Sequence, residues 1–523
     1  MTNVIWPLRE ARHLLAQPRS VTSPMLFEAG FGPSGPPHVG TLAECLRTSW
    51  VQRSWETLTG AKADFVVFCD DMDGLRRSPV GMETDLDRFR GLPLCRVPDP
   101  SGIHASWGER NLAMLVDMLR DWNVNYRIMR ASEAYGSGQF DASMLRVLEE
   151  HEQVAAVVRP TLGEALRASW SPFMPLHPVT GRVMSVEVQP VPAEGAVAWT
   201  DPANGRRMLT PVTGGQAKLG WKADWGMRWA ALGVDWEMNG KDLAENRPLS
   251  ESICRIIGGS PPLGMTAELL LDVDGSKLSK SRGGGMTAAD WVAMGGTESL
   301  SMFLMGAPEE ARRFHAGLIA PAIDALAQGA ERLVALDNIS EGTLENGTFI
   351  TSMQEPAWYA LGGVQPASFV SPFRFPTVLA IARVLRNQDL KVVISMLSGP
   401  GAGDLPEATQ RMAAYAHAMV ATESARPRAP TVDEATAMLS LAEALRALDT
   451  DVNAETIQSE AYAVGKATYG KAKLRLWFSA LYEVLLGGSD GPRFGRLTEI
   501  IGKDAMVAAL ENAALRAESA LLP

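Results

Sequence analysis

Two short segments of the chain carry residue types that can bind the phosphates of a nucleotide. The first is PSGPPHVGT at residues 33–41. Gly35 and Gly40 let the backbone approach a ligand with no Cβ atom in the way. A helix after this turn directs its free N–H groups toward an anion, and His38 can donate a hydrogen bond to a phosphate oxygen. Taken alone, such a turn is more often a structural one whose histidine only caps the helix.

The second segment is GSKLSKSRGGG at residues 275–285. Lys277 and Lys280 lie three positions apart in a loop of small residues, where they can clamp the negative charge that builds on a leaving pyrophosphate. A surface loop with this spacing is by itself usually only solvated charge. Together with the first segment, however, it predicts that His38, Lys277 and Lys280 converge on one nucleotide triphosphate.

Alternating strands and helices must position the first segment. The spacing of apolar residues predicts helices over 1–22, after residue 39 and over 111–122. Short apolar runs predict buried strands at 25–31, 65–71 and 125–133. Strand, helix and strand at these lengths predict a parallel α/β sheet with right-handed crossovers.

Two changes of pattern divide the rest of the chain. Around residues 155–215 valines alternate with polar residues and are interrupted by proline and glycine, which predicts an antiparallel β insertion. The α/β pattern resumes at 225–243, and a strand is expected at 267–275, leading into the lysine segment. Beyond about residue 290 nearly every segment has the pattern of an amphipathic helix.

The composition limits the class of protein. A chain of 523 residues is too long for one hydrophobic core and suggests two to four domains. The four cysteines lie far apart without a CxxC pair, which argues against a disulfide framework and against a cysteine zinc site. This cysteine usage makes a reducing cytoplasm the simplest compartment. No apolar run reaches the about 18 residues of a membrane span, so we expect no membrane partner. The net charge of −11 excludes a chain that is basic throughout, but not a local basic face.

The two segments resemble the signatures of class I aminoacyl-tRNA synthetases: PSGPPHVGT is similar to the HIGH motif and KLSKS to the KMSKS motif. Residues 68–76, 221–243 and 478–495 further resemble the class I lysyl-tRNA synthetase family. The resemblance implies a Rossmann-type catalytic domain at 1–290, interrupted by a β-rich insertion at about 140–215. It further implies a helical stem-contact region at 291–370 and an all-α anticodon-binding domain at 371–523.

The activity implied by the resemblance is the ATP-dependent joining of L-lysine to tRNA through a lysyl-adenylate, with Mg²⁺ as the metal and a monomer as the active form. No general base is required, because the amino-acid carboxylate is already a nucleophile at neutral pH. Catalysis would then rest on positioning and electrostatics.

The resemblance also assigns roles to individual residues. His38 and Thr41 would face ATP, while Lys277 and Lys280 would hold its triphosphate. The remaining nucleotide-binding candidates are Gly35, Gly40, Ser279, Ser281 and Asp242. Three aspartates follow the second strand: Asp70, Asp71 and Asp73. One of them, Asp70 or Asp71 above all, would hold the substrate ammonium, and another would hold only Arg76 or Arg77. The candidate pocket walls are Trp221, Trp225 and Ala267.

Three questions stay open at this point. Ala267 stands where the family usually has a tyrosine, so a paralogue that activates a related amino acid is the first alternative. A non-catalytic tRNA-binding paralogue is the second. A possible basic face for tRNA is formed by Lys471, Lys473, Arg475, Arg493 and Arg496, although an ordinary solvated face is as good an interpretation.

Overall fold

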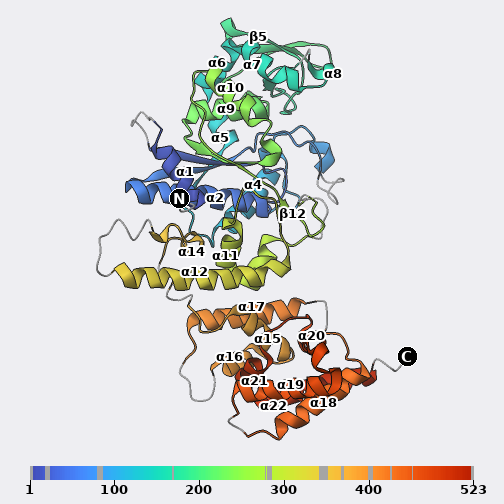
Figure 1. Cartoon of the computed structure of the whole chain (residues 1–523). Coiled ribbons are helices and arrows are strands. Elements are labelled where there is room, and N and C mark those ends of the chain that lie inside the picture. Colours follow the sequence, from blue (N-terminus) through green and yellow to red (C-terminus); the bar gives the residue numbers. More distant parts are fainter. Residues whose placement is uncertain are drawn as a thin grey trace. The chain divides into compact units, whose positions relative to one another are not determined.

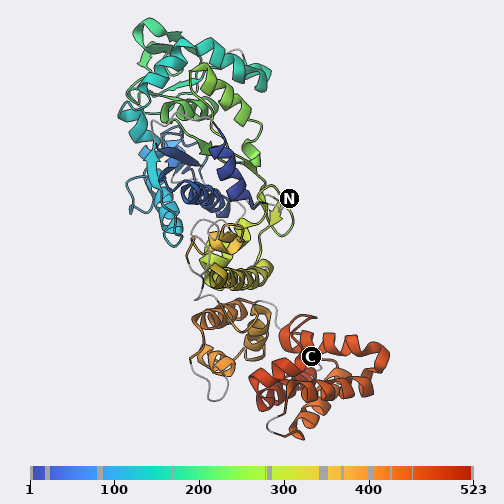
Figure 2. The same cartoon turned by 60° about the vertical axis from the view of Figure 1, so that its left-hand side comes forward.

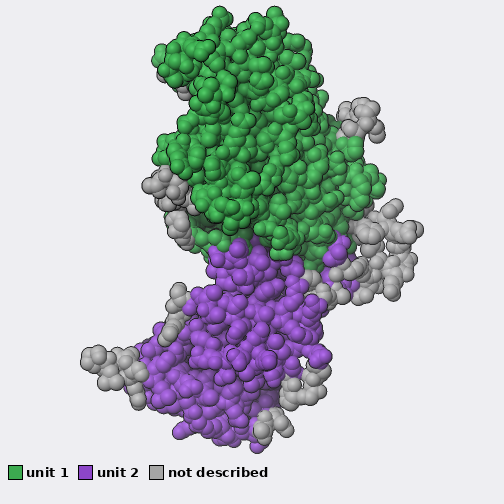
Figure 3. Space-filling view, turned by 180° about the vertical axis from the view of Figure 1, so that it is seen from behind, with its two compact units in different colours: residues 1–288, 304–315, 345–362 green, residues 289–303, 316–344, 363–523 purple. Residues whose placement is uncertain are grey.

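The computed structural model describes most of the chain. The described residues are 4–17, 24–78, 86–167, 170–276, 278, 285–340, 351–364, 366, 370–398, 404–423, 427–449 and 452–519. They form two compact units (Figure 3). Unit 1 contains residues 1–288, 304–315 and 345–362, and unit 2 contains residues 289–303, 316–344 and 363–523.

A parallel sheet lies at the centre of unit 1. Its strands β1 (Met25–Phe31), β2 (Ala63–Cys69), β3 (Arg127–Arg130) and β9 (Trp236–Glu237) stand in the order β3-β2-β1-β9. The short strands β10 (Asn239–Gly240) and β11 (Thr266–Ala267) pair in parallel beyond β9. Nearly every residue of β1 and β2 is buried, as expected for a parallel sheet covered on both faces. The strands predicted at 25–31 and 65–71 are therefore confirmed.

Helices cover this sheet (Figures 1 and 2). They include α1 (Trp6–Leu15), α2 (Val39–Thr59), α4 (Trp107–Leu119), α9 (Trp221–Leu232) and α10 (Arg247–Ile256). Phe68 and Val66 of the sheet belong to one continuous core with Trp229 of α9 and Ile253 of α10. This core fixes α9 against the sheet edge where the candidate site is found below.

The insertion is only partly β-structured. Its strands are β4 (Phe173–Pro175), β5 (Val188–Val191), β6 (Ala196–Thr200), β7 (Arg207–Pro211) and β8 (Ala217–Leu219), paired antiparallel as β5-β6-β7 and β4-β8. The helices α5 (Ala131–Gly136), α6 (Asp141–Glu149), α7 (His151–Val158) and α8 (Glu164–Arg167) precede them. The predicted β start at 155 is therefore wrong, because Val154, Ala155 and Val158 are buried at helical spacing.

Two predicted strands are shorter than expected. The strand predicted at 125–133 ends at Arg130, because Ser132 already belongs to α5 and its backbone N–H is bonded to Asp71. The strand predicted at 267–275 is reduced to β11 and to β12 (Leu270–Leu271), which pairs with β13 (Arg312–Arg313). A turn follows β12 directly, and Gly275 there has a φ of 82° that favours glycine.

The described part of unit 2 is almost entirely helical (Figure 1). Its main helices are α11 (Ala288–Met305), α12 (Ile319–Ser340), α15 (Phe375–Val384), α16 (Leu390–Ser398), α17 (Glu407–Thr422), α18 (Val432–Arg446), α19 (Ala454–Tyr469), α20 (Leu474–Leu486), α21 (Phe494–Ile501) and α22 (Lys503–Ser519). The predicted fold class, an α/β domain with a β-rich insertion followed by an all-α region, is confirmed. No described helix is long and apolar enough to cross a membrane.

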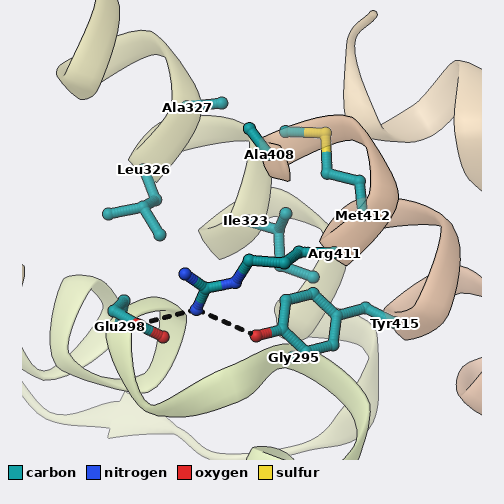
Figure 4. Close-up of a pocket in the computed structure, with 9 residues that line it drawn as sticks. All are labelled: Gly295, Glu298, Ile323, Leu326, Ala327, Ala408, Arg411, Met412 and Tyr415. Atoms are coloured by element: carbon teal, nitrogen blue, oxygen red, sulfur yellow. Dashed lines mark hydrogen bonds and ion pairs between the residues drawn. The ribbon is translucent and has the colours of Figure 1, made fainter. Parts of the chain in front are cut away.

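An ion pair joins α17 to α11 within unit 2. Arg411 donates to Glu298 of α11 at 2.7 Å and to the hydroxyl of Tyr415 at 3.3 Å (Figure 4). The cavity beside it is only about 20 Å³, enough for about one water molecule. Gly296 has a φ of 78° and leaves no room for a Cβ beside Tyr415. This place is therefore a helix junction with no space for a substrate.

Gly226 offers a test of the packing of α9 on α10. A Cβ at this position would clash with the carbonyl oxygen of Ser250 and lie 3.1 Å from the backbone nitrogen of Cys254. We expect Gly226→Ala to lower the free energy of unfolding by about 2 kcal/mol, the cost of overpacking a tight contact. Urea unfolding followed by tryptophan fluorescence measures it. Gly136→Ala, where the added Cβ meets nothing within 4 Å, is the matched control.

Candidate functional site

The turn between β1 and α2 is held in place by α4. Trp107 donates from Nε1 to the carbonyl oxygen of Ser34 at 3.1 Å. Asn111 donates from Nδ2 to the carbonyl oxygen of Pro33 at 2.9 Å. Both side chains are buried, so their bonds to the turn are protected from water. The predicted phosphate-binding turn, with Gly35 buried inside it, therefore has a defined backbone.

His38 is the N-cap of α2. Its Nδ1 accepts the backbone N–H of Thr41 at 3.1 Å, which places the ring hydrogen on Nε2. A Cβ on Gly40 would lie 2.7 Å from Cε1 of His38, so glycine is needed for the ring to take this position. The imidazole is exposed. His38 can thus cap the helix through one nitrogen and donate to a ligand through the other.

A cavity of about 220 Å³ lies at the carboxyl ends of β1, β2 and β9, with α9 along one side. Ligands of open parallel sheets bind at this edge. Three predicted substrate residues, Asp70, Trp221 and Trp225, line the cavity together. The other lining residues are Gly30, Phe31, Gly32, Glu44, Asp224, Arg228, Glu237, Met238, Asn239 and Leu243.

Arg228 is the central cation of this site. Its guanidinium donates to Glu28 of β1 at 2.6 Å and to Asp224 of its own helix at 2.9 Å. Glu237 of β9 lies 3.9 Å from it. Glu237 in turn accepts hydrogen bonds from the indole N–H groups of Trp225, at 2.8 Å, and of Trp229. The two tryptophans are thereby oriented by the same carboxylate.

Two further contacts join the insertion to this network. Tyr135 of α5 donates its hydroxyl to Asp224 at 2.5 Å and accepts the backbone N–H of Leu219 at 3.3 Å. Lys218 of β8, with no exposed side-chain surface, bonds Asp70 at 3.2 Å and also Asp73. Because each buried cation contacts carboxylates, its charge is compensated.

Burial raises the pKa of several of these carboxyl groups. The pKa rises to about 8 at Glu28, although Arg228 opposes the rise. Burial, together with the charge of Glu237, raises the pKa of Glu44 to about 8. The pKa of Asp70 rises to about 7 because burial outweighs the attraction of Lys218. Acidic groups thus outnumber the two cations, Arg228 and Lys218, and a cationic ligand would stabilise their ionised forms.

The structure places other predicted residues outside the cavity lining. Asp71 accepts from the backbone and hydroxyl of Ser132, at 2.7 and 2.6 Å, and so caps α5. Ala267 is buried in β11 beside Gly240. Asp242 is exposed in the short 3-10 helix Lys241–Leu243, and Thr41 is buried in the first turn of α2.

The position of the predicted lysine segment relative to the cavity is not described. Lys277, Ser279, Lys280 and Ser281 lie outside the described residues. The turn that precedes them is described: Asp272 donates its N–H to the carbonyl of Ser276, at 2.8 Å. The expected convergence of these residues with His38 stays a prediction. Among the described residues, no group of three or more His, Cys, Asp or Glu side chains is arranged to hold a metal ion.

Sequence reasoning missed most of the charged residues that line the cavity, and also Glu28, which pairs with Arg228 beside it. Glu28 stands alone in the apolar run MLFEAGF, and a charge that cannot leave a buried strand is a signal of a partner. Asp224 and Arg228 have the i,i+4 spacing of a helical ion pair within a tryptophan-rich helix. Glu44 and Glu237 carry no comparable local signal, since only the fold brings them to the cavity.

We expect the free energy of unfolding to fall as the pH rises from about 4.5 to about 8. In this range folded Glu28 holds a proton that an unfolded glutamate releases, so the folded chain binds more protons. Urea unfolding at pH 5 and at pH 8 measures the difference. Glu28→Gln, which has no charge to lose, should reduce it, whereas the exposed control Glu245→Gln should not. An equal pH dependence in wild type and Glu28→Gln would contradict the prediction.

Comparisons with known proteins show the family of the chain. The family model described as tRNA synthetases class I (K) matches residues 4–354. A lysine–tRNA ligase of Roseobacter denitrificans is 38% identical over 527 residues, which cover 98% of this chain and 97% of that protein. A lysine–tRNA ligase of Rickettsia bellii is 32% identical and the match covers 95% of each chain. The chain belongs to the class I (K) family of tRNA synthetases.

Proposed function

We propose that this chain joins L-lysine to its tRNA at the expense of ATP. The observation that carries the proposal is the acid-rich cavity, which lies at the same sheet edge as the turn capped by His38. A small cavity with an excess of carboxylates suits an amino acid that carries two ammonium groups. The lysine–tRNA ligases of Roseobacter and Rickettsia, similar over nearly their whole length, support the same substrate.

The first step would form the adenylate. An oxygen of the lysine carboxylate attacks the α-phosphorus of ATP, the bond to the β-phosphate oxygen breaks, and pyrophosphate leaves. His38 would donate from Nε2 to the phosphate oxygens, and the free N–H groups of α2 would face the same charge. In the second step a hydroxyl of the terminal ribose of tRNA attacks the lysyl carbonyl, and AMP leaves.

The cavity would hold the lysine for this attack. Glu44 and Asp70, which line the cavity from different elements, would receive ammonium groups, and Trp221 would form an apolar wall for the methylene chain. Trp225 is nearly buried, and its indole N–H is bonded to Glu237, so it would shape the cavity and not contact the ammonium groups. Binding of an ammonium group would lower the raised pKa of Glu44.

Several further assignments belong to the same proposal. Lys277 and Lys280, with Ser279 and Ser281, would hold the triphosphate, and Asp242 would approach the ribose. Mg²⁺ would arrive on the ATP and neutralise phosphate charge. Residues 291–370 would contact the tRNA stem and 371–523 the anticodon. The protein would act as a cytoplasmic monomer, and its four free cysteine thiols suit a reducing compartment.

Lysine-dependent exchange of pyrophosphate into ATP, measured with tRNA present, tests the function. We expect the wild-type chain to exchange pyrophosphate when lysine is supplied. Glu44→Gln should raise the KM for lysine about 30-fold, which corresponds to roughly 2 kcal/mol for a lost charged partner. The KM for ATP should stay unchanged. Glu245→Gln, an exposed acid outside the cavity lining, is the control.

Two outcomes of this assay would overturn parts of the proposal. Exchange with another amino acid and none with lysine would favour the paralogue suggested by Ala267, and Ala267→Tyr should then shift the amino-acid profile. No exchange with any amino acid, despite binding of tRNA, would favour a non-catalytic paralogue.

His38→Asn separates capping from catalysis. Asparagine also caps helices, so the stability of α2 should be retained. Its shorter amide cannot replace the donor at Nε2, and we expect kcat of the exchange reaction to fall about 100-fold, as for other lost transition-state donors. Steady-state kinetics and thermal unfolding give the two readouts. Full activity of His38→Asn would show that the residue only caps the helix.

A further inference from the structure

A lysine of the insertion lies buried beside the acids of the cavity. Lys218 of β8 has no exposed side-chain surface. Its ammonium donates to the two carboxylate oxygens of Asp70, at 3.2 and 3.5 Å, and also to Asp73. Apolar side chains of similar size are often as good for stability as a buried ion pair, because burying the charges is costly. Stability by itself therefore does not account for a cation at this position.

Two elements fix the backbone around Lys218. In the antiparallel ladder of β4 and β8, Lys218 pairs with Met174. The next residue, Leu219, donates its N–H to the buried hydroxyl of Tyr135 at 3.3 Å. The ammonium therefore reaches the end of β2 from a defined direction before any ligand binds.

Asp70 lies at the sheet edge, where it contacts Lys218 and also lines the cavity. Its backbone N–H donates to the carbonyl oxygen of Phe31 at 2.9 Å, which continues the pairing of β1 with β2. Its side chain keeps 18% of its surface exposed. An ionised carboxylate has about four acceptor sites, so contact with one ammonium leaves sites for another.

Two other acids that line the cavity are already engaged by donors of the protein. Asp224 accepts a bond from Tyr135 at one oxygen and from Arg228 at the other. Glu237 is held by two indole N–H groups. Among the described residues, by contrast, only the ammonium of Lys218 donates to the Asp70 carboxylate. Asp70 is therefore better suited than these two acids to receive a ligand ammonium.

The charge of Lys218 opposes the effect of burial on Asp70. Burial raises the pKa of Asp70 to about 7, and Lys218 is the main group that limits the rise. The negative charges of Asp73 and of Asp224 on α9 add to the rise, while Arg228 on α9 opposes it. Without Lys218, the buried Asp70 would hold its proton at neutral pH and offer a ligand ammonium only a neutral acid.

We propose that Lys218 is a positioning residue for the amino-acid substrate: its buried ammonium keeps the Asp70 carboxylate charged and in place at the cavity, where the carboxylate receives a substrate ammonium. Lys218 itself does not touch the substrate and takes no part in the chemistry. The inference rests on the proposed function and deepens it, since it names a residue of the insertion that determines how the cavity binds lysine.

Two measurements on the full-length chain test this role. Isothermal titration calorimetry gives the Kd for lysine, and pyrophosphate exchange with tRNA present gives the KM. Lys218→Met should raise both about tenfold at neutral pH, as expected when about one molecule in ten has Asp70 ionised, and leave the KM for ATP unchanged. Lys218→Arg, which keeps the cation, should restore most of the affinity. The control Lys62→Met removes an exposed lysine outside the cavity lining and should bind like wild type.

The pH dependence separates positioning from a purely structural role. As the pH rises from about 6.5 to about 8.5, Asp70 in Lys218→Met loses its proton, so the ratio of the variant Kd to the wild-type Kd should fall. Asp70→Asn has no such proton, and adding Lys218→Met to it should cause no further loss of lysine affinity. Should Lys218→Met fail to fold by circular dichroism, Lys218→Gln removes the charge but keeps a donor to both aspartates. It should show the same pH-dependent loss.

Three results would overturn the inference. Unchanged lysine affinity in Lys218→Met or Lys218→Gln would show that the charge has no effect on binding. Tighter binding would show that Lys218 competes with the substrate for Asp70. A Kd ratio that does not change with pH, or an equal loss in the Asp70→Asn background, would leave Lys218 with a structural role only. Absent exchange in wild type, with lysine binding intact, would refute the proposed function alone, because calorimetry still measures the effect of Lys218.

Discussion

The guanidinium of Arg228 compensates the buried acids on which the organisation of unit 1 depends. It contacts Glu28 of the central strand and Asp224 of α9, and it lies near Glu237 of β9. Each of these acids would be still more costly to ionise in the interior without a cation nearby. The planar group also stacks over Phe68, with 4.1 Å from Cζ to the ring centre. The side chain of Arg228 therefore links the central sheet to α9 and also lines the cavity.

The second constraint is the turn after β1. Two buried side chains of α4 bond its backbone, and His38 closes it by capping α2. Gly32, at the start of this turn, and Glu44, on α2, both line the cavity. A ligand in the cavity and an anion at the helix start would thus be positioned by one continuous piece of chain. This arrangement satisfies the need to bring a carboxylate and a phosphate together without moving either element.

Local pattern predicted much of this architecture, and the limits of the prediction have physical causes. The apolar runs at 25–31 and 65–71 could only be buried strands, and the helical C-terminal region followed from its periodicity. The helices within 155–167 were missed because they are short and are followed by a stretch rich in valine, proline and glycine, which is typical of antiparallel strands and turns. Among candidate site residues, Asp70 and Trp221 do line the cavity, whereas Asp71 faces Ser132. Glu44 and Glu237 depend on the packing of distant segments, which no local pattern contains.

The hydroxyl of Tyr135 has a consequence for how this protein can change over evolutionary time. It lies at the beginning of the insertion, accepts the N–H of Leu219 at the other end, and bonds Asp224 beside the cavity. The two ends of the long stretch of chain from α5 to β8 are therefore joined through this one hydroxyl, next to the contacts of Lys218 with Asp70 and Asp73. A change at this hydroxyl would therefore loosen both the return of the chain to the sheet and Asp224 at the cavity.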